Sequence, residues 1–433
     1  MNSALTWLAI GAVLGAIAWQ TLRTLLRGPA RPARFFRNQT YHFQTLRVFN
    51  GIPAGGADTG EILEALRGIR VGDAQSWYRG WNDAGERALK LAGAARHPRS
   101  RGGALLRAHN YFRTAQFLLP PGDPKRPLAF AKDNETFYAG LRSLGVAHEV
   151  IKVPYGEHSL KAVYYPVSGG SQTLPLIVFC GGYDSTLEEL YFTLVDGANR
   201  RGHAVLTYEG PGQGSALREQ GLTFTHEWER PTSAVLDAFL KGHDRPSKMI
   251  LVGMSMGGYL APRVAAFDSR FDGVVAFDVL FDMGEAAWRY VPPLVVWLAA
   301  HGMVALVEAI VRIKAATNPD LRWALANGQW VMGTRTPMDT LRAFDNYTLE
   351  GIASRITADV LILAGEKDHF VPLSQVERMR TALTGARSVT VRIFDQASGG
   401  AEHCQEGAMT LWHQAFFEWM GDRFPNPPGS VPS

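Results

Sequence analysis

The sequence has few cysteines and no concentrated charge of either sign. Its 433 residues include only two cysteines, Cys180 and Cys404, which excludes a disulfide scaffold and a four-cysteine zinc module. Lysine and arginine (44) barely outnumber aspartate and glutamate (40), and no basic cluster of the kind that binds nucleic acid interrupts the folded part. No histidine and carboxylate cluster has metal-ligand spacing, so we expect neither a metal nor another cofactor.

What remains is the composition of a large globular enzyme. Hydrophobic residues make up 46% of the chain and charged residues 19%, an ordinary balance for a folded protein. At about 150 residues per domain, the chain has room for two to three folding units. No internal repeat is evident, and a tail rich in proline, glycine and serine follows Phe424.

A long apolar run near the N-terminus predicts a membrane anchor. Residues 4–19 read ALTWLAIGAVLGAIAW, and residues 20–22 extend this run toward the roughly 20 residues that a bilayer needs. Arginines follow the run and no lysine or arginine precedes it, which favours a single-pass anchor with the catalytic domain on the cytoplasmic side. A helix packed on the protein itself is one alternative. A cleaved signal peptide, with Ala16-Ile17-Ala18 as its cleavage site, is another, but its positive n-region is missing.

Within this run, Gly11 and Gly15 form a G-x-x-x-G spacing. Such a spacing would let two helices approach closely and form a homodimer. Two small residues without a partner are the alternative interpretation. The segment that follows, residues 28–37, is rich in proline and arginine and is typical of a solvated linker at a membrane surface.

The period of the apolar residues changes along the rest of the chain. From about residue 43 to 119, apolar and aromatic residues recur three or four apart, which predicts helices. From about residue 149, runs such as LPLIVFC, KMILVGMS and DVLILAG alternate with stretches long enough for a helix. Strands that alternate with helices predict a mostly parallel sheet covered on both faces. The fold class is therefore α/β.

Between residues 281 and about 347 this alternation gives way to tryptophan-rich helical sequence. Its length would allow a second membrane span, but Pro292, Pro293, His301 and Glu308 fall inside it, so we interpret it as a helical lid. The predicted organisation is a membrane anchor and basic linker (1–38), a helical N-terminal domain (39–148), an α/β core in two parts (149–280 and 351–425), the lid between them (281–350) and a flexible tail (426–433).

A nucleophile is predicted where a strand runs into a helix. KMILVGM leads into Gly253-Met254-Ser255-Met256-Gly257, and the helical sequence YLAPRVAAF follows. This is G-x-S-x-G in the strand–turn–helix context that its mechanism needs, and the flanking glycines remove Cβ atoms that would clash in the turn. Ser255 is therefore the predicted nucleophile, and a purely structural turn serine is the alternative.

Two further side chains are needed, because a serine hydroxyl is too weakly acidic to attack unaided. A histidine must take its proton, and a carboxylate must orient that histidine. Asp368 follows the strand DVLILAG and His403 follows the last strand, SVTVRIFD, so both are expected at the sheet edge where ligand chemistry occurs. Glu366 is the alternative acid. His369 is the alternative base, but it adjoins Asp368 on one loop and cannot easily reach both Asp368 and Ser255.

Charge that develops on a substrate oxygen needs N–H donors. One candidate is the backbone N–H of Met256, and the other is that of Tyr183, in the loop after the strand LPLIVFC. Asp184 in this loop would oppose the developing charge, so we expect it to face His403 or to contact the substrate; capping the helix LEELYFTLV is the alternative. The turn YEGPGQG lacks the lysine of a phosphate cradle and is interpreted as a tight loop at the sheet edge.

Together, GMSMGG, GGYDST, YEGPGQG, AGEKDHFVP and GGAEHC resemble the α/β-hydrolase superfamily, over roughly residues 43–424. With SWYRGW and HNYFRTAQFLL, the chain resembles the branch that holds 2,6-dihydroxypseudooxynicotine hydrolase and the fungal hydrolases that shorten polyketides. The resemblance implies a serine hydrolase that cleaves a C–C bond next to a carbonyl in an aromatic or polyketide-like molecule. It also favours a functional Asp184, because that branch has an acidic residue there. The N-terminal apolar run departs from the soluble relatives.

Three hypotheses follow. In the first, Ser255 attacks a ketone and a C–C bond breaks. The second keeps the same residues and changes the substrate to an ester, thioester or peptide. The third is a catalytically inactive, membrane-tethered binding protein. For the enzymes we expect a small hydrophobic or aromatic carbonyl substrate. Aromatic lid residues are available to line its pocket: Trp288, Tyr290, Trp323 and Trp330.

Overall fold

The computed structural model describes Trp19, residues 34–167 and residues 174–425. By its contacts the chain divides into two compact units, Met1–Thr45 and Leu46–Ser433, and apart from the start of α2 the features discussed below lie in the second. The apolar run predicted to be an anchor lies outside the described residues, except for Trp19. Among the helices that are described, none is both long and apolar enough to cross a membrane. The domain boundaries drawn from the sequence stay predictions.

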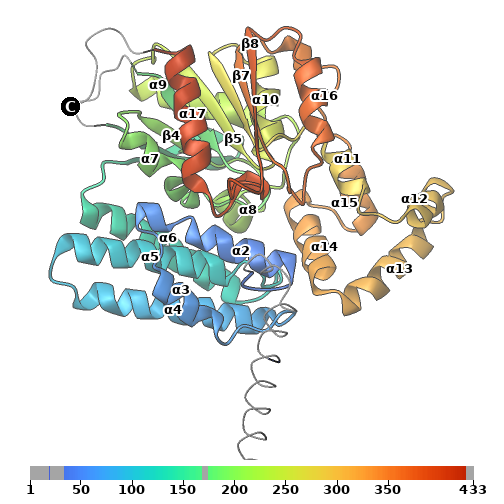
Figure 1. The fold of residues 1–433 in the computed structure, drawn as a ribbon, viewed down its shortest axis with the longest axis horizontal. Coiled ribbons are helices and arrows are strands. Elements are labelled where there is room, and N and C mark those ends of the chain that lie inside the picture. Colours follow the sequence, from blue (N-terminus) through green and yellow to red (C-terminus); the bar gives the residue numbers. More distant parts are fainter. Residues whose placement is uncertain (1–18, 20–33, 168–173, 426–433) are drawn as a thin grey trace, which may run out of the picture. The chain divides into compact units, whose positions relative to one another are not determined.

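An eight-stranded sheet forms the centre of the larger unit, with the strands in the order β1-β2-β4-β3-β5-β6-β7-β8 (Figure 1). The strands β1 and β2 pair antiparallel, as do β2 and β4, and all other neighbours are parallel. The prediction of a mostly parallel sheet is therefore confirmed. The strands are β1 (Glu149–Tyr155), β2 (His158–Tyr165), β3 (Leu176–Cys180), β4 (Val205–Tyr208), β5 (Met249–Met254), β6 (Gly273–Phe277), β7 (Asp359–Gly365) and β8 (Ser388–Phe394).

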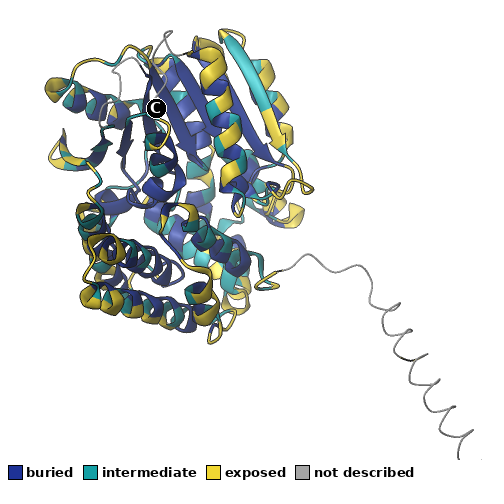
Figure 2. Ribbon diagram, turned by 60° about the vertical axis from the view of Figure 1, so that its left-hand side comes forward, coloured by how far each residue is buried: buried dark blue, intermediate teal, exposed yellow. Residues whose placement is uncertain are grey.

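Both faces of this sheet are buried, which explains why its central strands are apolar throughout. Along β3, Val178 packs into the cluster on one face, whereas its neighbours Ile177 and Phe179 pack into the cluster on the other. Figure 2 shows the central strands buried and the edge strand β8 partly exposed. The helical segments connected to the strands are a π-helix (Tyr191–Val195), α7 (Asp196–Asn199), α8 (Gly214–Gln220), α9 (Glu229–Gly242), α10 (Gly257–Phe267), α16 (Ser374–Ala382) and α17 (Met409–Arg423), with short 3-10 turns at Ala353–Arg355 and His403–Gln405.

Helices precede the sheet in the chain. They are α2 (Gln39–Phe49), a 3-10 turn (Ile52–Ala54), α3 (Thr59–Leu66), α4 (Ala74–Ala94), α5 (Pro98–Ala115) and α6 (Lys125–Leu144). Local signals fix their ends: the Asp73 carboxylate accepts from the Ser76 N–H at the start of α4, and Gly145 ends α6 with a φ of 73°. The helices α4, α5 and α6 pack side by side (Figure 1).

The tryptophan-rich segment between β6 and β7 forms short helices. They are α11 (Met283–Trp288), α12 (Pro293–Ala300), α13 (Val304–Thr317), α14 (Pro319–Met332) and α15 (Pro337–Phe344). The apolar stretch that resembles a membrane span is broken between α12 and α13, where Gly302 has a φ of 76°. The two helices pack on each other and on α15 through a small apolar cluster that includes Val295, Val307 and Met338.

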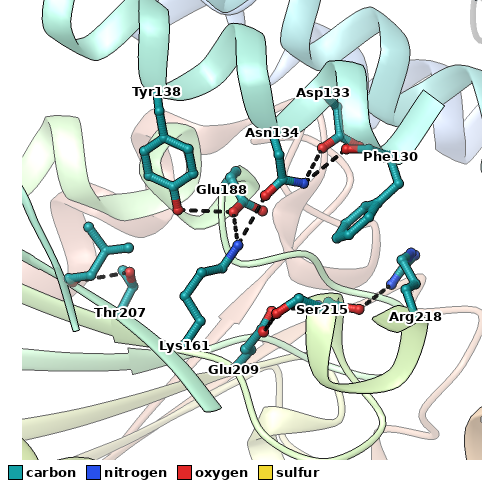
Figure 3. Close-up of polar contacts among 12 residues, drawn as sticks. Phe130, Asp133, Asn134, Tyr138, Lys161, Glu188, Thr207, Glu209, Ser215 and Arg218 are labelled. Atoms are coloured by element: carbon teal, nitrogen blue, oxygen red, sulfur yellow. Dashed lines mark hydrogen bonds and ion pairs between the residues drawn. The ribbon is translucent and has the colours of Figure 1, made fainter. Parts of the chain in front are cut away.

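A buried ion pair joins the helical layer to the sheet (Figure 3). Lys161 on β2 donates to the Glu188 carboxylate (2.7 Å) and to the Asn134 side chain on α6 (3.0 Å). The Tyr138 hydroxyl, also on α6, donates to the same Glu188 oxygen (3.1 Å). Burial would raise the pKa of Glu188, but the Lys161 ammonium outweighs burial and holds this pKa below its ordinary value. Glu188 is therefore a fully buried charge that depends on one cation.

Replacing Lys161 with methionine is expected to lower the free energy of unfolding by about 3–5 kcal/mol, because Glu188 then lies buried without a counter-ion. Lys132→Met is the matched control. Its partner Glu86 and Lys132 itself are both 44% exposed, so that pair contributes only about 0–1 kcal/mol. Urea unfolding curves of both variants at neutral pH measure the difference. Equal losses for the two lysines would contradict the stated role of Lys161.

Candidate active site

Ser255 occupies a strained turn between β5 and α10. Its φ of 61° lies in the left-handed region, which residues with a side chain rarely adopt. The turn also leaves no room for side chains around it. A Cβ at Gly253 would lie 2.0 Å from the Gly257 oxygen, and one at Gly258 would lie 1.7 Å from the Asp278 oxygen. The glycines of GMSMGG are thus what the chain needs to present Ser255 at the end of β5.

His403 and Asp368 form a hydrogen-bonded chain with Ser255. The Nε2 atom of His403 lies 2.8 Å from Ser255 Oγ, and its Nδ1 atom lies 2.6 Å from Asp368 Oδ2. The second oxygen of Asp368 accepts from the backbone N–H groups of Phe370 (2.7 Å) and Val371 (3.0 Å). The structure therefore brings together the three side chains that the sequence pointed to, although Ser255 and His403 are 148 positions apart.

The alternative acid and base have other partners. Glu366 accepts from the Gln396 N–H (3.0 Å). The imidazole of His369 faces Glu402, whose carboxylate lies 3.4 Å from Nδ1. Asp368 and His403, and not Glu366 and His369, are therefore the acid and the base that are aligned with Ser255.

The surroundings of His403 prepare it to act as a base. The side chains of His403 and Asp368 are only 5% and 4% exposed. Burial alone would lower the pKa of His403, but the Asp368 carboxylate outweighs burial and holds this pKa well above its ordinary value. Burial would raise the pKa of Asp368, and the adjacent imidazole lowers it below its ordinary value instead. With Nδ1 protonated toward Asp368, Nε2 is the atom that accepts the Ser255 proton.

Two backbone N–H groups lie beside the nucleophile. Gly182 packs so closely on the turn that a Cβ there would lie 2.7 Å from Ser255 Cβ and 2.9 Å from Met256 N. The peptide unit that carries the Tyr183 N–H therefore lies next to Ser255. Within the described part of the chain, neither this N–H nor that of Met256 donates a hydrogen bond. Two unpaired donors beside a nucleophile are what an oxyanion hole requires.

Gln213, which the sequence analysis did not single out, holds the loop that carries Tyr183. Its side chain is buried and donates through Nε2 to the carbonyl oxygens of Gly181 (2.9 Å) and Gly182 (2.8 Å), while Oε1 accepts from the Gly210 N–H (3.1 Å). The turn YEGPGQG is thus the support of the neighbouring loop. No local pattern announces this contact, because donor and acceptors lie 31 and 32 positions apart.

Replacing Gln213 with leucine is expected to lower kcat by about 10–100-fold with a smaller change in KM. The reason is that loss of one oxyanion donor alone costs about 10²–10³-fold, and a displaced loop weakens such a donor. Gln220→Leu is the matched control, since Gln220 bonds to Ser159 on β2. Steady-state kinetics on a p-nitrophenyl ester measures both variants. A Gln213→Leu enzyme that changes only in KM would contradict this role.

Asp184 is paired with Arg47. The Nη1 atom of Arg47 donates to Asp184 Oδ1 (3.0 Å), and its Nη2 atom donates to Glu189 Oε1 (2.5 Å). Arg113 bonds to the other oxygen of Glu189, so two arginines balance two carboxylates beside the oxyanion loop. Asp184 therefore adds no uncompensated negative charge there. A contact of Asp184 with the substrate, or a part for it in proton transfer, stays a prediction, and Arg47 was not foreseen.

Asp278, directly after β6, connects the two loops that carry Asp368 and His403. It is fully buried, and its Oδ2 atom accepts from the backbone N–H groups of Gly365 (3.2 Å) and Cys404 (3.0 Å). Burial, reinforced by the nearby Asp368 carboxylate, raises the pKa of Asp278 to about 6. Asp278 thus holds the backbone of both loops whose side chains, Asp368 and His403, are hydrogen-bonded to each other.

One cluster of described residues could hold a metal ion by distance alone. Ligand atoms of Asp278, His403 and Cys404 lie within 4.8 Å of one another. Both ring nitrogens of His403 are already bonded to Ser255 and Asp368, and burial raises the pKa of Cys404 to about 11, which keeps the thiol protonated. These three side chains are therefore better suited to holding the imidazole in position than to binding a metal ion.

Comparisons with known proteins show which family the chain belongs to. The alpha/beta hydrolase family matches residues 177–404. Hydrolase acrC of Aspergillus aculeatus is 33% identical and covers 92% of this chain and 100% of its own length. The 20-hydroxy-prefusarin hydrolase FUS2 of Gibberella moniliformis is 32% identical and covers 90% of this chain and 98% of its own. The crystal structure of 2,6-dihydroxy-pseudo-oxynicotine hydrolase has the same fold (TM-score 0.64, 21% identity, 87% of this chain and 95% of that chain). The resemblance noted from the motifs is thereby confirmed.

Proposed function

Because the chain belongs to the alpha/beta hydrolase family, we propose that it is a serine hydrolase in which Ser255 is the nucleophile, His403 the general base and acid, and Asp368 the residue that orients His403. The observation that carries this proposal is the unbroken chain of short hydrogen bonds from Ser255 Oγ through the imidazole to Asp368. The N–H groups of Met256 and Tyr183 stabilise the oxyanion.

The preferred reaction is hydrolysis of a C–C bond next to a carbonyl, in a small aromatic or polyketide-like substrate. Ser255 Oγ adds to the ketone carbon while His403 takes its proton. The tetrahedral intermediate then collapses, the C–C bond breaks, and the carbon leaving group takes the electron pair as an enolate that His403 protonates. Water, deprotonated by His403, hydrolyses the acyl-enzyme to a carboxylic acid. Such a leaving group must be delocalised, as it is in a β-dicarbonyl compound.

What favours C–C cleavage is the motif set described above, together with the pairing of Asp184 and Arg47 beside the oxyanion loop. This pairing keeps a carboxylate close to the site without opposing the oxyanion. Hydrolysis of an ester, a thioester or a peptide uses the same nucleophile and oxyanion hole and is the second candidate.

The two candidates are separated by incubating the purified protein with benzoylacetone and acetylacetone beside p-nitrophenyl esters. Loss of the diketone with formation of one ketone and one carboxylic acid per molecule is the expected result. Ser255→Ala protein is the control for spontaneous cleavage. Turnover of the esters without cleavage of either diketone would remove the C–C proposal and leave the esterase.

A further inference from the structure

A pocket lined by Tyr183 and Asp184 carries an excess of positive charge. Arg113, Arg126 and Arg218 also line it, and its only acidic lining residue is Asp184. Asp184 is already paired with Arg47, and Arg113 with Glu189. The other two arginines are Arg126 on α6 and Arg218 on α8. Among the described residues, no carboxylate lies at ion-pair distance from either guanidinium group.

Arg126 is buried, and two of its nitrogen atoms lack a hydrogen-bond partner among the described residues. The residue is 6% exposed, and its Nε and Nη1 atoms make no hydrogen bond within the described structure. The Nε atom of Arg218 is also buried and unpaired, although its Nη1 atom donates to the Gly214 oxygen (3.3 Å). Burial, reinforced by the nearby Arg218, lowers the pKa of Arg126 to about 9. Two like charges held together in a buried site are unfavourable until an anion joins them.

Aromatic rings hold the two guanidinium groups in place. Arg126 Cζ lies 4.3 Å from the centre of the Trp330 ring, and Arg218 Cζ lies 5.4 Å from the same ring. Arg218 also lies over Phe130 (5.0 Å), and Figure 3 shows it apart from the Lys161–Glu188 pair. Other polar atoms of lining residues are unpaired as well: Gln116 Oε1, Thr186 Oγ1 and Asn327 Nδ2.

The pocket adjoins the nucleophile through two consecutive residues. Tyr183 lines the pocket, and the residue before it, Gly182, packs against Ser255. We propose that this pocket binds an anionic oxygen group of the substrate, a carboxylate or an ionised β-dicarbonyl enol, between Arg126 and Arg218 while the scissile carbonyl lies at Ser255. A planar pair of oxygens matches the guanidinium donors. The inference rests on the proposed hydrolase function and adds the substrate class.

The kinetic test uses two substrate pairs, each made of a carboxylic acid, which is negatively charged, and its neutral methyl ester. They are p-nitrophenyl hemiglutarate with its methyl ester, and succinylacetone with its methyl ester. Wild-type enzyme is expected to prefer the acid of each pair in kcat/KM, and Arg126→Gln to reduce this preference by about 10–100-fold, mainly through KM. Arg245→Gln, which removes an exposed arginine, is the matched control and keeps the preference. Wild-type enzyme with no preference for either acid would overturn the inference.

A binding measurement separates this inference from the proposed chemistry. Calorimetry on Ser255→Ala protein, which does not depend on turnover, is expected to show binding of p-nitrophenyl hemiglutarate and loss of this binding in Ser255→Ala/Arg126→Gln. Selective binding of the acid would uphold the pocket even if no diketone is cleaved. Equally tight binding of inorganic phosphate would mark a site for adventitious anions only and would overturn the substrate assignment.

Stability provides a readout that distinguishes ligand binding from a structural role. If Arg126 serves the substrate, Arg126→Met removes an unpaired buried charge, and its Tm should equal or exceed that of the wild type. If the stacking of Arg126 on Trp330 serves the fold, the same variant should have a lower Tm, and that result would overturn the inference.

Discussion

Ser255→Ala is expected to lower kcat by about 10⁴-fold or more, because no other group in the site replaces the nucleophile. His403→Ala should cost a similar factor, and the double variant little more than either, since the residues of a triad act as a unit. Turnover of p-nitrophenyl esters measures all three, with circular dichroism to confirm that each variant is folded.

A fluorophosphonate probe tests the same prediction by covalent labelling of the nucleophile, without a rate measurement. Such a probe reacts with an activated serine, so it should label the wild-type protein and not Ser255→Ala. Ser143→Ala is the matched control, because Ser143 is a half-buried serine on α6 that bonds to the Pro98 oxygen. Labelling that persists in Ser255→Ala would identify another nucleophile. An unlabelled wild-type protein would revive the hypothesis of an inactive binding protein.

Asp368→Asn is expected to lower kcat by about 10⁴-fold while the protein remains folded, because an amide favours the wrong imidazole tautomer. Glu366→Gln is the control on the same loop, and it should retain most of the activity, since Glu366 bonds to the Gln396 backbone. If the Glu366 variant lost activity and the Asp368 variant kept it, the assignment of the acid would be reversed.

The Asp368 variant should also change the pH dependence. In the proposed mechanism the base is neutral His403, and Asp368 holds the pKa of His403 well above its ordinary value. The imidazole therefore keeps its proton to higher pH, and wild-type kcat/KM should rise with pH with an inflection above 6.5, the ordinary value of a histidine. Without the carboxylate, the inflection should move to lower pH. An inflection that does not move would show that another group sets the acid limb.

The strands and the three triad candidates could be foreseen because their signals are local. After its first residue, a run such as DVLILAG is apolar since it is buried on both faces, and GMSMGG encodes its own tight turn. Asp368 and His403 follow from topology, because residues just after parallel strands meet at one edge of the sheet. The order of these three residues, together with the strand that precedes each of them, was enough to predict that they meet.

The groups that support the site could not be foreseen, because their partners are distant. Asp278 bonds to Cys404, which lies 126 positions away, and Gln213 bonds to the backbone of another loop. Backbone acceptors look alike in every sequence, so no residue type identifies them. Of the four aromatic lid residues available for the pocket, Trp330 lines it, whereas Tyr290 is 60% exposed.

The pairing of Arg47 with Asp184 has a consequence for any shortened form of the protein. The segment that matches the family, residues 177–404, contains every atom that would break the bond, but Arg47 lies 137 positions before Asp184. A fragment that begins after α2 would keep the three proposed triad residues but lose the one cation that lies at ion-pair distance from Asp184 among the described residues. One counter-ion beside the proposed oxyanion site is in this sense supplied by a helix distant in sequence, which a shorter fragment would have to replace.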